Sequence, residues 1–169
     1  MPEATKSTAP LRRFEVFVRG LPIPQGSSRA FRNKRTGQPI TVTKTGNLVA
    51  WRHAIQTVLS FYWDGAPIDG PVALSLIFIF PRVKSAPKRV FHIVTPDEDK
   101  LCRAALDAMT GVAFTDDARV FAPTPLGIYG DEPGVHIFLR ELGETAEALR
   151  AFRLECADRE FDAVKGARA

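Results

Sequence analysis

The segment from Val72 to Phe80, with the sequence VALSLIFIF, constrains the fold of this chain more than any other. Eight of its nine side chains are apolar, and many are β-branched or aromatic, which favours a strand. Because successive side chains of a strand point to opposite faces, a continuous apolar run must be covered on both faces. Pro81 ends the run. We therefore predict a central strand of a sheet.

Periodicity and turn residues predict the remaining elements. Helices are predicted from Asn47 to Tyr62, from just after Asp97 to about Gly111, and from Glu144 to Glu160, with further strands near residues 14–18, 40–43, 119–122 and 135–140. The length of 169 residues fits one domain. The polar residues 1–13 are predicted to be a disordered leader, and residues 14–169 a single α+β domain with a mixed sheet flanked by helices.

Charge is distributed unevenly along the chain, whose net formal charge is +4. Between residues 1 and 53, ten Lys or Arg stand against two acids, which gives this part an excess of eight positive charges. Between residues 91 and 117 the balance reverses, with six acids against Lys100 and Arg103. A strongly basic segment favours an anionic partner such as a nucleic acid.

Neither the cysteines nor the apolar segments suggest an unusual compartment. Cys102 and Cys156 lie far apart, without the spacing of a zinc site, and are predicted to be reduced thiols. No apolar segment follows the first basic residues, and the run near residues 72–80 is far too short to span a bilayer. We expect a soluble cytoplasmic protein without a membrane partner.

Four acidic residues flank the second predicted helix, with Asp97 and Asp99 at its start and Asp116 and Asp117 after its end. Each has a structural explanation on its own. Asp97 suits an N-cap, Asp99 complements the helix dipole, and an Asp pair suits a turn. A short helix with its return loop is expected to bring Asp116 or Asp117 back near Asp97 and Asp99. Such a cluster is unfavourable unless a cation occupies it.

Clustered carboxylates with room for water and a phosphate are typical of a magnesium site. Mg²⁺ can lower the pKa of a water, orient it and offset charge at a scissile phosphate, so this chemistry predicts hydrolysis of a nucleic-acid backbone. Lys and Arg would then hold a polyanion that carboxylates alone repel. The sequence has neither a G-x-S-x-G motif nor a Walker-type glycine loop, so covalent hydrolase chemistry and a nucleotide cofactor are not expected.

The residues around these acids resemble the signature of the RusA family of Holliday-junction resolvases. The resemblance rests on Pro96-Asp97-Glu98-Asp99-Lys100-Leu101, Ala104-Ala105-Leu106-Asp107-Ala108-Met109-Thr110-Gly111 and Asp116-Asp117-Ala118-Arg119-Val120. The turn Gly20-Leu21-Pro22, the helix around Trp51 and the strand ending at Pro81 also stand where the family has them. The similarity covers about residues 14–140 and leaves the final helix outside.

This resemblance implies a RusA-like fold and a Mg²⁺-dependent homodimeric endonuclease, with Mn²⁺ as a substitute ion. The family cuts paired strands of four-way DNA junctions in recombination, repair or phage DNA processing, and its genes are commonly carried by phages or prophages. By position, Asp97, Asp99 and Asp117 match the catalytic, metal-binding acids. Asp116, a fourth candidate metal ligand, and Asp107 match recurrent acids. A two-fold dimer would let two sites address two strands.

Two basic residues beside the acids are candidates for substrate contact. Arg103 falls where the family prototype has a catalytic lysine, and it keeps a cation there but replaces a point charge with a planar fork. Lys100 stands where the prototype has asparagine, although lysine there resembles phage-type members, and we expect it to contact phosphate. The segment 123–128 departs from the family, because a lysine is expected on the strand after the Asp pair.

Further candidate DNA-binding residues lie on two basic segments. They are Arg29, Arg32, Lys34 and Arg35, which surround Phe31, and Lys84 and Lys88, which precede Arg89. Phosphate contacts beside one aromatic side chain are typical of binding at a branch point. A solvated basic loop is the simpler interpretation of either segment.

Two other functions are compatible with these residues. One is a nuclease that prefers flaps, forks or replication intermediates, which a comparison of cleaved substrates would reveal. The other is a DNA-binding accessory protein that lost catalysis through Arg103 or the missing lysine, which metal-dependent cutting would exclude.

Overall fold

The computed structural model describes residues 11–26, 29–32, 39–42, 46–85, 87–143 and 145–167. A four-stranded sheet has the order β1 (Arg13–Arg19), β6 (Gly134–Glu141), β4 (Val72–Pro81) and β5 (Val120–Gly130). Strands β2 (Arg29–Arg32) and β3 (Pro39–Val42) form a separate antiparallel pair. The helices are α1 (Gly46–Tyr62), α2 (Glu98–Met109) and α3 (Ala146–Gly166), and a short 3₁₀ helix spans Asp117–Arg119.

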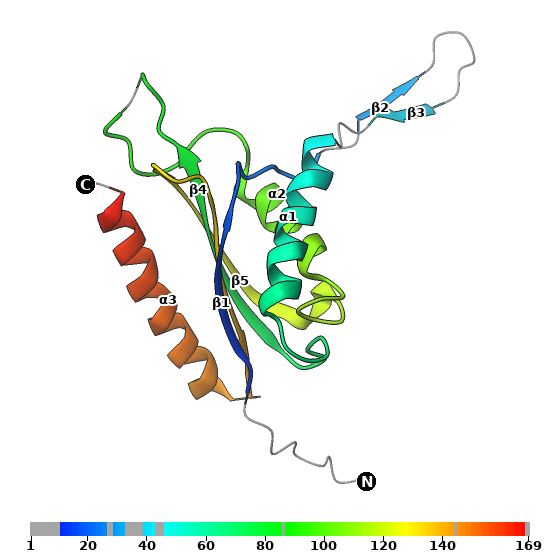
Figure 1. Ribbon diagram of the computed structural model, residues 1–169, viewed down its shortest axis with the longest axis vertical. Coiled ribbons are helices and arrows are strands. Elements are labelled where there is room, and N and C mark those ends of the chain that lie inside the picture. The colour runs from blue at the N-terminus through cyan, green and yellow to red at the C-terminus, as the bar shows by residue number, and fades with distance from the viewer. Residues whose placement is uncertain are drawn as a thin grey trace.

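The main sheet is mixed, because β4 pairs antiparallel with β6 and parallel with β5. Helices α1 and α2 cover one face of this sheet and α3 covers the other (Figure 1). The predicted α+β fold with a mixed, helix-flanked sheet is therefore confirmed. Strand β5 is much longer than the segment 119–122 predicted from the sequence. Its Pro123 and Pro125 masked the pattern, and both are tolerated because β5 lies at a sheet edge.

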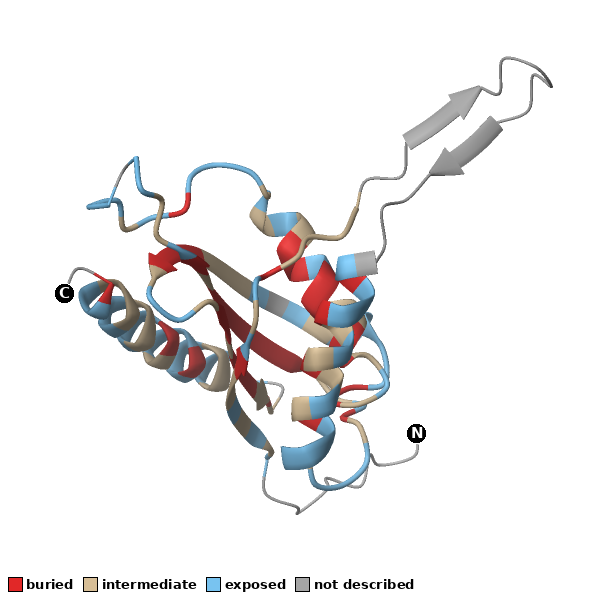
Figure 2. Ribbon diagram, turned by 45° about the horizontal axis from the view of Figure 1, so that its top comes forward, coloured by how far each residue is buried: buried red, intermediate tan, exposed pale blue. Residues whose placement is uncertain are grey.

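The predicted central strand is β4, and its side chains alternate between two cores. Leu74, Leu76 and Phe78 pack against α1 and α2, while Ala73 and Ile77 belong to clusters on the α3 face. Figure 2 shows the buried residues following this strand through the middle of the molecule. The apolar residues at successive positions of the run are thus explained by burial on both faces.

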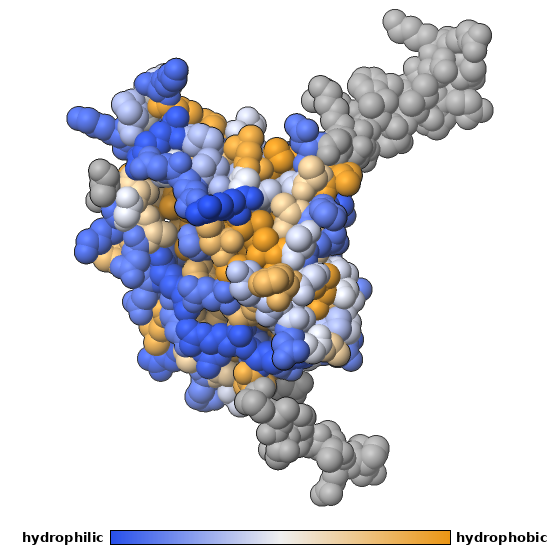
Figure 3. Space-filling model, viewed as in Figure 1, coloured by the Kyte–Doolittle hydropathy of each residue, from blue (hydrophilic) through white to orange (hydrophobic). Residues whose placement is uncertain are grey.

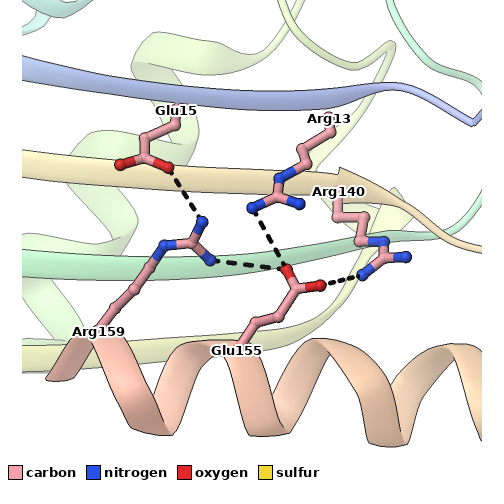
Figure 4. A network of polar contacts seen from close by, with 5 residues as sticks. All are labelled: Arg13, Glu15, Arg140, Glu155 and Arg159. Carbon is pink, nitrogen blue, oxygen red and sulfur yellow. Dashed lines mark hydrogen bonds and ion pairs between the residues drawn. The ribbon is translucent and has the colours of Figure 1, made fainter. Parts of the chain in front are cut away.

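Helix α3 buries one side against the sheet and leaves the other exposed. Phe152 is 2% exposed and packs with Leu142 and Cys156, whereas Leu154 is 61% exposed. A polar network also joins α3 to β1 and β6 (Figure 4). In it, Glu155 accepts from Arg140 at 2.8 Å and Arg159 donates to Glu15 at 3.0 Å. The sheet face opposite α1 and α2 is closed by this helix.

Replacing Phe152 with alanine is expected to lower the free energy of unfolding by about 3–5 kcal/mol, because it opens a cavity between α3 and the sheet. Leu154→Ala on the same helix is the matched control, and a change within about 0.5 kcal/mol is expected because Leu154 is exposed. Urea unfolding of both variants measures the difference. Equal losses in the two variants would show that α3 does not pack as described.

The predicted leader, residues 1–13, lies mostly outside the described residues, which begin at Leu11. Arg12 makes an ion pair with Glu141 at 3.2 Å, and β1 starts at Arg13, opposite Arg140. Cys102 and Cys156 are free thiols, as predicted. Both are buried, and burial raises the pKa of Cys102 to about 11. Within the described ranges, no helix combines the length and apolar character needed to cross a membrane.

Candidate functional site

The segment that leads to Asp97 is held on the free edge of β5. The backbone N–H of His92 donates to the Gly127 carbonyl at 3.0 Å, and that of Tyr129 donates to the Val90 carbonyl at 2.8 Å. Phe91 and Ile128 form an antiparallel bridge between these bonds. The segment therefore covers part of an otherwise unpaired strand edge and fixes where α2 begins.

Glu98 fixes the first turn of α2 to the same place. Its Oε1 accepts a hydrogen bond from the Gly127 backbone N–H at 3.1 Å. A Cβ on residue 127 would lie 3.1 Å from the His92 Cβ and 3.2 Å from Glu98 Oε1, so glycine permits this close approach. No local sequence pattern indicates a role for Glu98, Gly127 or His92. Only the fold brings these three residues together.

Asp97 does not cap α2, although it occupies the N-cap position. Its carboxylate instead pairs with Lys100 Nζ at 2.7 Å, and about half of its side chain is exposed. The hydrogen bond and charge of Asp97, with the charge of Asp99, raise the pKa of Lys100. Asp99 is exposed in the first turn. The carboxylates of Asp97 and Asp99 and the ammonium group of Lys100 thus lie together at the start of this helix.

A cleft of about 940 Å³ opens beside this end of α2 and is lined by both Asp97 and Lys100. Its other walls come from residues 21–26, from Phe80, Pro81 and Val83 at and just after the end of β4, and from His92, residues 94–96 and Tyr129. The backbone N–H of Gln25 donates to the Lys100 carbonyl at 2.9 Å, which joins two of these walls. In Figure 3, apolar atoms are exposed between the loop that leaves β4 and the start of α1.

The second pair of acids lies beyond the other end of α2. Asp116 caps the 3₁₀ helix by accepting from the Ala118 N–H at 2.9 Å, and Asp117 is exposed beside it. The preceding loop is bound to the segment before β4, since Ile68 N–H donates to the Ala113 carbonyl at 2.9 Å. Arg119 also pairs with Asp69 at 2.9 Å. These contacts hold Asp117 near the beginning of β5.

The two pairs of acids are therefore not brought together within one chain. Helix α2 has 12 residues and spans about 18 Å, with Asp97 before its first residue and Asp117 well after its last. The loop after α2 pairs with Ile68 rather than folding back toward Asp97. Among the residues that the structure describes, no three potential ligands lie close enough to hold one ion. The described residues of one chain therefore do not show the expected return of Asp116 or Asp117 to Asp97 and Asp99.

Arg103 and Asp107 follow Asp99 along α2 at intervals of four residues, and their surroundings differ. Asp107 is ion-paired with Arg52 of α1, which also donates to Gln25 Oε1. This acid therefore ties α2 to α1 and to the wall of the cleft. Arg103 is exposed and has no ion pair within the described ranges, so its guanidinium can contact a substrate.

The basic segments can be placed only in part. Lys84 and Lys88 are exposed on the loop that leaves β4, on the way to Asp97. The backbone of Arg29 and Arg32 lies in β2, but their side chains, and all of Lys34 and Arg35, lie outside the described residues. His92 is buried, and its ring stacks on that of Phe80 with the two centroids 3.9 Å apart.

The side chains of Asp97 and Asp99 offer the kind of ligand that Mg²⁺ prefers, because both are exposed carboxylates. Mg²⁺ is usually held by one or two protein carboxylates, with waters and substrate phosphates completing the shell. Asp97 and Asp99 match that number. A site with three or four carboxylates does not fit a single chain.

The comparisons with known proteins agree with the motifs around the site. The sequence model of the family described as endodeoxyribonuclease RusA matches residues 20–140. The matched part contains the cleft, both pairs of acids and three of the four strands of the main sheet. A search of curated proteins finds no match. Helix α3 lies beyond the matched residues.

Proposed function

Because this chain belongs to the endodeoxyribonuclease RusA family, we propose that it resolves four-way DNA junctions by Mg²⁺-dependent cutting of paired strands, in recombination, repair or phage DNA processing. The observation that carries the proposal is the family match over most of the chain. The Asp97 carboxylate also supports the proposal. It is exposed beside Lys100 and does not cap α2, so it is available for chemistry.

In this proposal, Asp97 and Asp99 hold the ion at the start of α2, and Mn²⁺ can replace Mg²⁺. Bound Mg²⁺ would supply a water of lowered pKa and offset charge on the phosphodiester. Lys100 exchanges its contact with Asp97 for a substrate phosphate when the carboxylate is engaged elsewhere. Arg103, one helical turn after Asp99, binds a second phosphate oxygen through its planar fork.

Asp117, with Asp116, completes the site of a second copy of the chain in a two-fold dimer. The reason is the distance of about 18 Å along α2, which keeps the two ends of one chain apart. A two-fold axis would place the second end of one copy opposite the first end of its partner and create two equal sites. Two sites would also explain paired cuts.

Cleavage of a labelled four-way junction and a matched linear duplex, in Mg²⁺ and in EDTA, tests the proposal. Symmetric nicks in the junction alone, lost in EDTA, are expected. Faster cutting of flaps or forks than of four-way junctions would favour a replication-intermediate nuclease. Junction binding without cutting in any divalent ion would leave a DNA-binding accessory protein on this fold.

Glu98 is expected to act as a positioning residue because its carboxylate fixes the first turn of α2 to Gly127. Glu98→Ala should slow junction cleavage about tenfold, since the supports of metal ligands typically contribute that much. Glu98→Gln keeps an acceptor oxygen for the Gly127 N–H and should restore most of the rate. Equal losses in both variants would instead indicate that the charge of Glu98 is required.

A further inference from the structure

The cleft beside Asp97 is larger and more apolar than metal chemistry requires. Its walls and floor are built mainly by apolar side chains, including Leu21, Ile23, Phe80, Val94, Pro96 and Tyr129. The charged residues of its lining are Asp97 and Lys100. A cavity of this kind is suited to bind a ligand that has an apolar body and an anionic group.

Leu21 and Val94 reach the cleft from two separate segments and remain 52% and 50% exposed. Large apolar side chains that are exposed together at a cavity commonly mark a binding surface. Below them, the ring of Phe80 stacks on His92, and the ring of Tyr129 lies 5.3 Å from His92. The floor is therefore formed by packed rings.

A nucleotide has the matching chemistry, with a flat apolar base and an anionic phosphate. A phosphate beside Asp97 and Lys100 leaves its own base next to the apolar cleft. A volume of about 940 Å³ admits one nucleotide but not a stacked duplex. A base can reach the cleft only after it leaves the helical stack, which costs least where it is unpaired.

We propose that this cleft receives one unstacked nucleobase adjacent to the scissile phosphate. This inference rests on the proposed nuclease function and adds a selectivity step to it. In a linear duplex the base must first be unpaired and unstacked, whereas at a branch point part of that free energy has already been spent. The cleft therefore favours branched DNA without reading a sequence.

Val94→Trp tests the proposal, because an indole at an exposed rim position fills the cleft without disturbing the core. Ile93→Trp is the matched control, since Ile93 is 73% exposed and is not part of the cleft lining. Val94→Trp should slow cleavage of a fully paired junction at least about tenfold, because the indole occupies the place where the base would stack. Ile93→Trp should cut at the wild-type rate.

A junction with an abasic site beside the scissile phosphate makes the test specific. Val94→Trp and wild type should cut it at equal rates, because no base needs the cleft. A defect that persists on the abasic junction, or wild-type cutting of the paired junction by Val94→Trp, would overturn the proposal.

A binding measurement separates this proposal from the nuclease function itself. With 2-aminopurine at the same nucleotide, its fluorescence should change on binding of wild-type protein and of Ile93→Trp, but not of Val94→Trp. This readout needs no cutting. If the wild-type protein cuts no DNA, a fluorescence change would still support binding of a base in the cleft. The absence of a change would overturn it.

Discussion

Replacing Asp99 with asparagine will lower the rate of junction cleavage at least about 100-fold without weakening junction binding. The loss of a direct metal ligand should exceed the 10–100-fold typical of its supporting residues. Asp99 is exposed, and the described ranges show no ion pair for it, so the isosteric amide should leave the fold intact. The substitution also removes a negative charge that repels DNA.

The measurement compares single-turnover cleavage and gel-shift affinity for wild type, Asp99→Asn and Asp162→Asn. Asp162 is an exposed acid of α3, far outside the matched family segment, and its amide variant controls for the loss of one charge. It should cut at the wild-type rate. Full activity of Asp99→Asn would show that Asp99 is not a metal ligand and that other acids hold the ion.

Much of the fold could be predicted because its signals are local. The apolar run of β4 required cover on both faces, and the structure supplies it with α1 and α2 on one side and α3 on the other. Trp51, Ile55 and Leu59 recur at helical spacing in α1 and are buried, whereas Phe61 and Tyr62 at its end are 81% and 62% exposed. Strand β5 escaped because prolines, which an edge strand tolerates, conceal its length.

The candidate site was less predictable because it depends on pairing between distant segments. No local pattern indicates that the Gly127 N–H meets the Glu98 carboxylate, a bond between residues 29 positions apart. The same holds for the pairing of Ile68 with Ala113, which directs Asp116 and Asp117 away from Asp97. Sequence spacing correctly placed two acids at each end of α2, but it could not show that the chain does not fold back.

Mixing two inactive variants tests whether the site is shared between copies. If the acids of α2's two ends meet across a dimer, Asp99→Asn and Asp117→Asn are each inactive alone. A mixed dimer then has one site with both substitutions and one intact site. With random pairing, about a quarter of the wild-type sites should reappear. The product should be a nicked junction, since each mixed dimer can cut only one strand.

Co-expression of the two variants, with different affinity tags for purification of the mixed dimer, allows the comparison on a defined sample. Asp97→Asn mixed with Asp99→Asn is the decisive control, because both substitutions affect the same end of α2 and no arrangement restores an intact site. Restored nicking in the first mixture alone supports sharing between copies. If dimers are present but neither mixture nicks the junction, Asp117 acts in the same chain as Asp99. The loop after α2 would then have to rearrange on DNA.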